Sequence, residues 1–237
     1  MTALEGPIVS RLQAAFEPHR DPARAAGMAR YMRDQFSFLG IPGPERERLQ
    51  REALTGMPRP SPEDLREAAL ALWQLAEREY QYAACSLLAR HARLLGPEFM
   101  PVLRELVTTK SWWDTVDTLA SHVAGPIVRA HPPTAAVMDE WIEDANIWLA
   151  RVALLHQLRA KKMTDAGRLF RYCELRAGDT EFFIRKAIGW ALREYSKTDA
   201  EAVRAFVSAH EEMLSGLSKR EALLWLNGGR KGGAARG

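Results

Sequence analysis

An aromatic or apolar residue opens a helical segment about every 35 residues through most of this chain. The five opening residues are spaced 33, 35, 35 and 34 residues apart, and they are Tyr80, Trp113, Trp148, Phe183 and Leu217. An alanine-rich or apolar stretch follows each of them, and prolines or glycines fall between successive segments. A recurrence of this length with two helices per unit is typical of an α-solenoid.

The recurrence predicts an all-α fold, a solenoid of HEAT-like repeats that curves and places the second helix of each pair on its concave face. The Trp-x-x-Leu-Gly-x-x-Tyr pattern of tetratricopeptide repeats is missing from the sequence, and no useful β-alternation interrupts the helical periodicity. We expect residues 1–226 to form a single repeat domain, followed by a disordered, Gly-rich basic tail over 227–237.

The sequence of the N-terminal third predicts helices that do not follow this regular recurrence. Residues 8–39 have helical character, and Asp21-Pro22 can open a second helix that runs on to Leu39. A turn cluster at 40–44 precedes a charged helix over 45–54, and the proline-rich stretch 57–62 separates that helix from a new start at Ser61-Pro62.

Composition limits the class of protein. With 47% hydrophobic and 27% charged residues in 237, the chain resembles an ordinary soluble protein, and neither a membrane-spanning run nor a secretory signal is visible. Cys85 and Cys173 have no metal-ligand spacing and are expected to be buried free thiols in a reducing cytoplasm. We therefore expect a cytoplasmic protein that needs no metal and no cofactor.

The net charge of +3 is carried by the tail. Residues 227–237 contribute three basic residues and no acid, so the remaining chain contains 30 residues of each sign. A nucleic-acid partner therefore requires basic residues concentrated on one surface. Arg151, Lys186 and Arg220 each lie three residues after a repeat-opening residue, which predicts a basic stripe suited to a phosphate backbone. The alternative is that these cations belong to solvated, salt-bridged helix faces.

Two tryptophans lie beside charged residues at helical spacing. Trp113 and Asp117 are four residues apart and share a helix face, as do Lys186 and Trp190. Gly189 beside Trp190 permits close helix packing. The ordinary interpretation is that both indoles are core residues and that Asp117 is a solvated or capping carboxylate.

Several segments together resemble the AlkD-type alkylpurine DNA glycosylases, a family of HEAT-like DNA alkylation repair proteins. The resemblance covers roughly residues 8–226, and its segments are Met28–Met32, Phe38–Ile41, Thr109–Asp117, Asn146–Arg151, Phe182–Tyr195 and Leu217–Ala222. The combination is specific, whereas no single segment is. The weakest match is Pro42-Gly43-Pro44.

The resemblance implies a monomeric bacterial enzyme of base excision repair that hydrolyses the N-glycosidic bond of positively charged purines in duplex DNA, such as 3-methyladenine and 7-methylguanine. It implies that Asp117 is the catalytic carboxylate, that Trp113 and Trp190 face the lesion, and that Arg151 binds a phosphate. The expected DNA contacts are Tyr31, Lys110, Arg151, Lys186, Arg193, Lys219 and Arg220.

Two other functions are compatible with the residue pattern. A non-catalytic HEAT-like protein could bind DNA through the same basic stripe, with Asp117 serving only the structure. A protein–protein scaffold is the commonest use of α-solenoids, and it would show little salt-dependent affinity for DNA.

Overall fold

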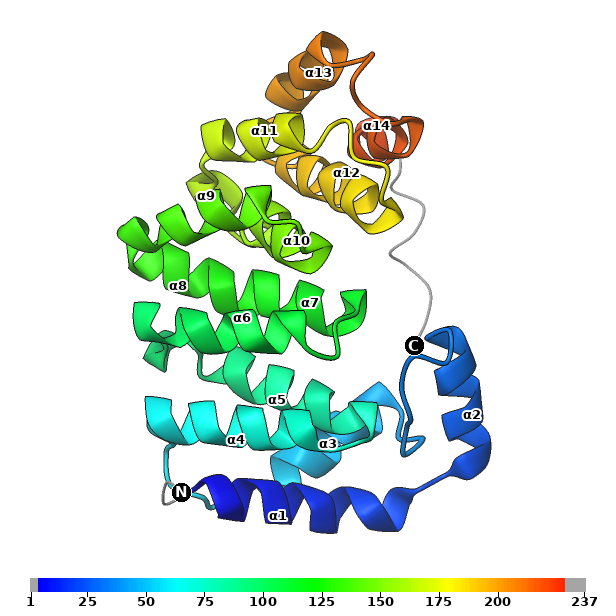
Figure 1. The fold of residues 1–237 in the computed structure, drawn as a ribbon, viewed down its shortest axis with the longest axis vertical. Helices are drawn as coiled ribbons and strands as arrows, with labels where there is room; N and C mark the ends of the chain where they lie inside the picture. The colour runs from blue at the N-terminus through cyan, green and yellow to red at the C-terminus, as the bar shows by residue number, and fades with distance from the viewer. Residues whose placement is uncertain (1–3, 229–237) are drawn as a thin grey trace. The chain divides into compact units, whose positions relative to one another are not determined.

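The computed structural model describes residues 4–228, and the regular structure within this range is helical (Figure 1). The β-type pairing in this range is a single isolated parallel bridge between Ser37 and Glu77. Within each unit, helices that are close in the sequence pack against one another, and the all-helical structure confirms the predicted all-α, HEAT-like repeat architecture.

The contacts divide the chain into two compact units, with the boundary between Leu106 and Val107. The single domain expected over 1–226 stays a prediction. Of the expected tail, residues 229–237 lie outside the described range, and Asn227 and Gly228 belong to a turn after the last helix.

The first unit contains the helices that precede the middle of α6 (Met100–Thr108). Its helices are α1 (Glu5–Phe16), α2 (Pro22–Tyr31), α3 (Gly43–Ala53), α4 (Pro62–Gln74) and α5 (Arg78–Arg90), and the unit boundary falls inside α6. α1 packs on α3 and α4, and α4 packs on α5. Leu12, Phe16 and Leu72 are fully buried between these helices and form part of the core.

The two proline-led helix starts of this unit are confirmed. Asp21 caps α2 by accepting a hydrogen bond from the backbone N–H of Arg24. Ser61 caps α4 in a capping box, in which Asp64 accepts a hydrogen bond from the backbone N–H of Ser61 in return.

The predicted continuation of helix to Leu39 is wrong. α2 ends at Tyr31, because Arg33 and Asp34 take left-handed backbone conformations with φ of 55° and 54°. The following segment is held by the fully buried Glu79, whose carboxylate accepts hydrogen bonds from three successive backbone N–H groups, those of Leu39, Gly40 and Ile41. Such long-range capture by a buried side chain leaves no signal in the local sequence.

The second unit carries the regular repeat. Its helices are α7 (Trp113–Leu119), α8 (Gly125–Ala130), α9 (Ala135–Glu143), α10 (Ile147–Leu155), α11 (Ala166–Leu175), α12 (Phe182–Ser196), α13 (Ala200–Ala209) and α14 (Gly216–Leu223). α7, α10, α12 and α14 pack in series, with α9 against α10 and with α11 and α13 against α12 (Figure 1). The series begins at residues 113, 147, 182 and 216, which confirms the recurrence.

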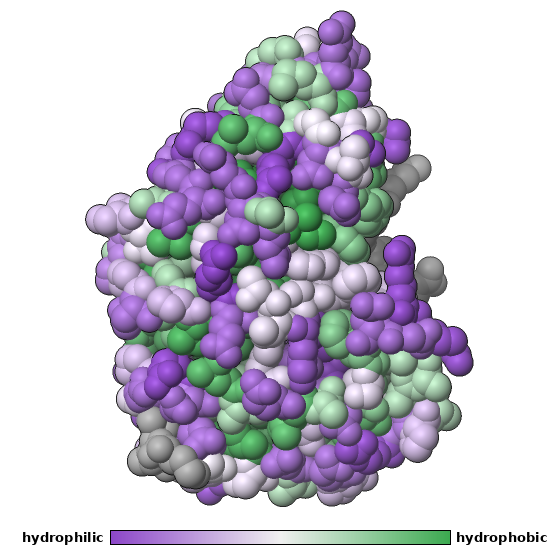
Figure 2. Space-filling view, viewed as in Figure 1, coloured by the Kyte–Doolittle hydropathy of each residue, from purple (hydrophilic) through white to green (hydrophobic). Residues whose placement is uncertain are grey.

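The visible face of the molecule is predominantly polar, with apolar residues in small separate patches (Figure 2). Among the described residues, no helix combines the length and hydrophobicity needed to cross a lipid bilayer.

Candidate active site

The N-terminal end of α7 presents two of the predicted site residues. Trp112 has an extended backbone and precedes the helix, so Trp113 is the first helical residue. Ser111 supports the turn by donating a hydrogen bond from its hydroxyl to the carbonyl of Val107. Trp113 and Asp117 therefore lie one helical turn apart on one side of α7, as their spacing predicts.

Asp117 forms a buried, two-point ion pair with Arg151 of α10. Arg151 Nε lies 2.6 Å from Asp117 Oδ1, and Arg151 Nη2 lies 2.8 Å from Asp117 Oδ2. The Arg151 side chain is 4% exposed and the Asp117 side chain is 13% exposed. This planar arrangement fixes both the position and the rotation of the carboxylate.

Burial raises the pKa of Asp117, and the hydrogen bonds and charge of Arg151 oppose the rise without cancelling it. A carboxylate with a raised pKa and one dedicated guanidinium partner is a common feature of functional sites. The ordinary interpretation of Asp117 as a solvated or capping residue does not describe this geometry.

A cluster of three aromatic rings reaches the arginine through one of its members, Phe183. Trp112, Trp148 and Phe183 form a cluster with ring centroids 5.0 to 5.8 Å apart, and the Phe183 ring also lies 5.9 Å from the guanidinium carbon of Arg151. The backbone carbonyl of Phe183 accepts a hydrogen bond from Arg151 Nη1. The recurrence marked Trp148 and Phe183 as helix openers, but it gave no indication that they pack together around Arg151.

Trp190 and Asp117 line one open depression of about 290 Å³. Trp190 is partly exposed on α12. The preceding Gly189 allows α14 to approach closely, because a Cβ at this position would lie 2.4 Å from Glu221 Cβ and 3.0 Å from the Ser218 carbonyl oxygen. Trp113 is not among the residues that line this depression, so Trp190 shares the depression with Asp117, whereas Trp113 lies one helical turn away from Asp117.

A π-helical turn over Ala120–Ala124 brings a histidine into the same depression. The Ser121 hydroxyl donates its proton to the Asp117 carbonyl at 2.8 Å, so its contact with His122 Nδ1 at 2.9 Å requires Nδ1 to be the donor. Burial and then the charge of Arg159 lower the pKa of His122, and a hydrogen bond with the Thr118 backbone opposes the shift. π-turns are frequent at functional sites but have no reliable sequence signature, so the sequence did not reveal His122.

The predicted basic stripe is not a row of free charges. Glu221 of α14 pairs with Lys186 at 2.6 Å and with Arg193 at 2.7 Å, and Arg151 is committed to Asp117. These ion pairs are closer to the alternative interpretation, in which the cations belong to salt-bridged helix faces, than to a continuous basic stripe.

The remaining predicted DNA contacts are more accessible. Arg220 is exposed and forms no ion pair within residues 4–228, whereas Lys219 donates a hydrogen bond to the Glu211 carbonyl. Lys110 has a left-handed φ of 48° just before α7, and Tyr31 of the first unit is 73% exposed. The DNA-binding roles of all these residues stay predictions.

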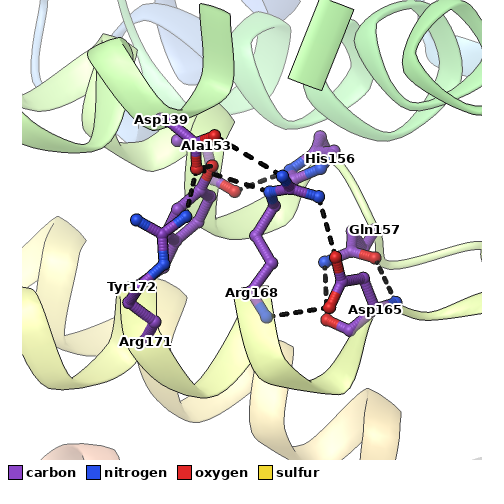
Figure 3. Close-up of polar contacts among 8 residues, drawn as sticks. All are labelled: Asp139, Ala153, His156, Gln157, Asp165, Arg168, Arg171 and Tyr172. Carbon is purple, nitrogen blue, oxygen red and sulfur yellow. Dashed lines mark hydrogen bonds and ion pairs between the residues drawn. The ribbon is translucent and has the colours of Figure 1, made fainter. Parts of the chain in front are cut away.

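A second cluster of polar side chains joins α9 to α11 (Figure 3). Asp139 accepts hydrogen bonds from Arg168, Arg171 and Tyr172. His156 lies beside them, fully buried, with its Nδ1 2.7 Å from the Ala153 carbonyl. The residues around Asp139 satisfy one another, so this cluster is structural.

No metal centre accompanies either cluster in the described part of the chain. Within residues 4–228 no group of three or more His, Cys, Asp or Glu side chains is arranged to hold a metal ion. Cys85 and Cys173 are both buried and neither forms a disulfide, and burial raises the pKa of the Cys173 thiol.

The family comparison matches almost the whole chain. The model of the DNA alkylation repair enzyme family matches residues 12–226. A solved structure titled "Predicted DNA alkylation repair enzyme from Enterococcus faecalis" is 35% identical, with a TM-score of 0.81 over 89% of this chain and 98% of that one.

A second solved structure is the Pseudomonas fluorescens alkylpurine DNA glycosylase AlkC bound to DNA containing an abasic site analog. It is 18% identical, with a TM-score of 0.53 over 93% of this chain and 61% of that one, so the similarity concerns the fold. No curated protein matches the sequence. From the extent of the family match and the 35% identity to the Enterococcus protein, the chain belongs to the DNA alkylation repair enzyme family.

Proposed function

We propose that the chain is a monofunctional DNA glycosylase that hydrolyses the N-glycosidic bond of positively charged alkylated purines in duplex DNA. The observation that carries the proposal is the Asp117–Arg151 pair, which holds a carboxylate of raised pKa at the edge of an open depression walled by Trp190. Family membership and the DNA-bound state of the solved AlkC structure support DNA as the partner.

The lesion supplies much of the driving force. A purine alkylated at N3 or N7 carries a positive charge, and loss of the glycosidic bond neutralises it, so the leaving base needs no general acid. Departure of the base leaves an oxocarbenium-like sugar. A fixed carboxylate near the anomeric carbon stabilises this cation and orients the attacking water, and we assign both roles to Asp117.

The tryptophans favour the cationic lesion. Trp190 borders the depression with Asp117, and an indole face attracts a cation through its ring quadrupole. Trp113, one turn before Asp117, would contact the deoxyribose or base from the other side. An uncharged lesion would lack this attraction and would also be a poorer leaving group.

Arg151 has two tasks in this proposal. Its Nε and Nη2 groups donate to the Asp117 carboxylate and orient it, and Nη1 donates to the Phe183 carbonyl. These three hydrogen bonds use three of the five N–H donors of the guanidinium. A contact with the phosphate beside the lesion would use the remaining two donors without breaking the pair.

The testing experiment measures release of 7-methylguanine and 3-methyladenine from methylated duplex DNA, in the presence of a chelator. We expect Asp117→Asn to lower the single-turnover rate by about 10²–10³-fold or more, because the neutral amide cannot stabilise the developing cation. Asp139→Asn is the matched control and should retain excision. Uracil-containing duplex should yield almost no released base.

The outcomes separate the alternatives. Wild-type protein that binds the methylated duplex yet releases no base would be a non-catalytic DNA-binding protein. Wild-type protein without salt-dependent affinity for DNA would favour a protein–protein scaffold. Retention of full activity in Asp117→Asn would remove Asp117 from the chemistry.

A further inference from the structure

A separate depression of about 390 Å³ lies entirely within the first unit. It is bordered by the C-terminal ends of α3 and α5, by the segment 57–60 and by Ile8 of α1. None of its lining residues belongs to the Asp117 site, and neither the sequence motifs nor the family match assigns it a role.

Three arginines border this depression, namely Arg51, Arg59 and Arg90. All three are exposed, and none forms an ion pair within residues 4–228. The acidic residue among the lining side chains is Glu47, which lies 3.8 Å from Arg46. The local charge is therefore positive in a unit where other arginines, such as Arg20 and Arg66, pair with glutamates.

The pKa of His91 reflects the same concentration of positive charge. Burial lowers the pKa of this lining histidine, and the charges of Arg90 and Arg59 lower it further. The helix dipole explains why Arg51 and Arg90 suit the last turns of α3 and α5. It does not explain Arg59, which belongs to no helix, nor the amide described next.

Gln50 lines the depression with an unsatisfied acceptor. Its side chain is only 7% exposed, and its Nε2 donates a hydrogen bond of 2.9 Å to the buried carbonyl of Ala83. This bond fixes the orientation of the amide, because the carbonyl can only accept. Gln50 Oε1 has no donor partner in the described structure. Buried polar atoms of this kind normally have a partner, and an amide oxygen can accept a hydrogen bond from an N–H or O–H donor.

Apart from Ser86, the rest of the lining is apolar. Ile8 and Leu87 are each 3% exposed and form part of the floor, and Met57 and Pro58 belong to the wall. A depression of a few hundred Å³ with apolar walls and a few convergent polar groups is characteristic of small-molecule sites. The three arginines add the ability to hold a phosphate in a planar, multidentate contact.

We propose that this depression binds a phosphorylated molecule of mononucleotide size. The phosphate contacts Arg51, Arg59 and Arg90, and the planar part of the molecule lies on the apolar floor. Gln50 Oε1 is buried, so one N–H group of the molecule donates to it after the side chains that cover this oxygen have moved. The proposal does not depend on the glycosylase activity, because it concerns residues outside the Asp117 site.

The test measures binding of AMP, adenosine and inorganic phosphate to the full chain by isothermal titration calorimetry. We expect AMP to bind more tightly than adenosine or phosphate, and Arg51→Gln/Arg90→Gln to weaken AMP binding at least about tenfold through loss of two charge-assisted contacts. Arg93→Gln is the matched control, because Arg93 is exposed nearby but does not line the depression. Circular dichroism melting verifies that each variant is folded.

A second variant tests the amide. Gln50→Met keeps the volume but removes the acceptor, so it should weaken AMP binding and leave the affinity for phosphate unchanged. If this variant binds AMP as tightly as the wild type, the assigned role of Gln50 is wrong, even if the arginine variant behaves as expected.

A short undamaged duplex distinguishes the two sources of phosphate. If the double arginine variant weakens duplex binding while AMP does not bind to the wild type, the arginines hold DNA phosphates and the mononucleotide assignment is overturned. If the variant alters affinity for neither AMP nor duplex, the depression is not a phosphate site.

Discussion

The Asp117 and Asp139 regions show two ways of placing a carboxylate among arginines in the same unit. Asp117 is 13% exposed and has one guanidinium partner, whereas Asp139 is 33% exposed and accepts hydrogen bonds from Arg168, Arg171 and Tyr172. Burial raises the pKa of both, but at Asp139 the three donors outweigh it, so the pKa of Asp139 is lowered and that of Asp117 is raised.

Under the proposed function, this difference separates a reactive carboxylate, Asp117, from a structural one, Asp139. Asp139 joins α9 to α11 and has its charge distributed over several donors (Figure 3). Asp117 is oriented by Arg151 but retains access to a depression, so its field acts on whatever occupies that space. The three predictions below test this contrast, beginning with the largest effect.

Arg151→Met should destabilise the protein by about 3–5 kcal/mol, because it leaves Asp117 buried without a partner. Arg171→Met is the matched change at Asp139, and it should cost at most about 1 kcal/mol, because Arg171 is half exposed and Asp139 keeps other donors. Urea unfolding at neutral pH measures both. Equal losses of stability would contradict the contrast, and Asp117→Asn/Arg151→Met should recover part of the loss.

Stability should fall by about 3 kcal/mol as the pH decreases from 6.5 to 4, because burial lowers the pKa of His156 from 6.5 to about 4. In this range the unfolded chain binds a proton that the folded chain does not, so acid favours unfolding. Asp117 contributes the opposite sign, since its raised pKa means that the folded state takes up the proton first.

His156→Gln should remove most of that slope, measured as the change in unfolding free energy with pH. His131→Gln alters an exposed histidine and serves as the control. A slope unchanged in His156→Gln would show that the acid response comes from elsewhere.

The smallest effect concerns the pH dependence of excision. The single-turnover rate should fall toward acid pH as Asp117 becomes protonated. Because the pKa of Asp117 is raised, the midpoint of this acid limb should lie above the ordinary aspartate pKa. Asp139→Asn should leave this limb in place. A limb at or below the ordinary value would indicate that Asp117 is not the titrating group.

Much of the second unit follows from local sequence. The 35-residue recurrence predicted the series α7, α10, α12 and α14, and the spacing of Trp113 and Asp117 placed both on one side of α7. Helical periodicity and capping are properties of neighbouring residues, so they can be predicted without knowledge of the tertiary fold.

Other features depended on residues distant in the sequence. Nothing near Arg151 indicates that Asp117, 34 positions earlier, occupies two of its donors, or that Glu221 neutralises Lys186. Likewise, the non-helical segment 39–41 is held by the distant Glu79, and a π-helical turn accompanies the placement of His122 in the depression.

The sequence by itself determined the repeat, the helix starts and the family, because these are encoded in short-range patterns and in motifs read along the chain. Only the tertiary structure decided which charges are paired, how deeply they are buried and which side chains share a cavity. Ion pairing and desolvation depend on the packing of separate helices, so the raised pKa of Asp117 and the unsatisfied amide of Gln50 became visible only in the folded protein.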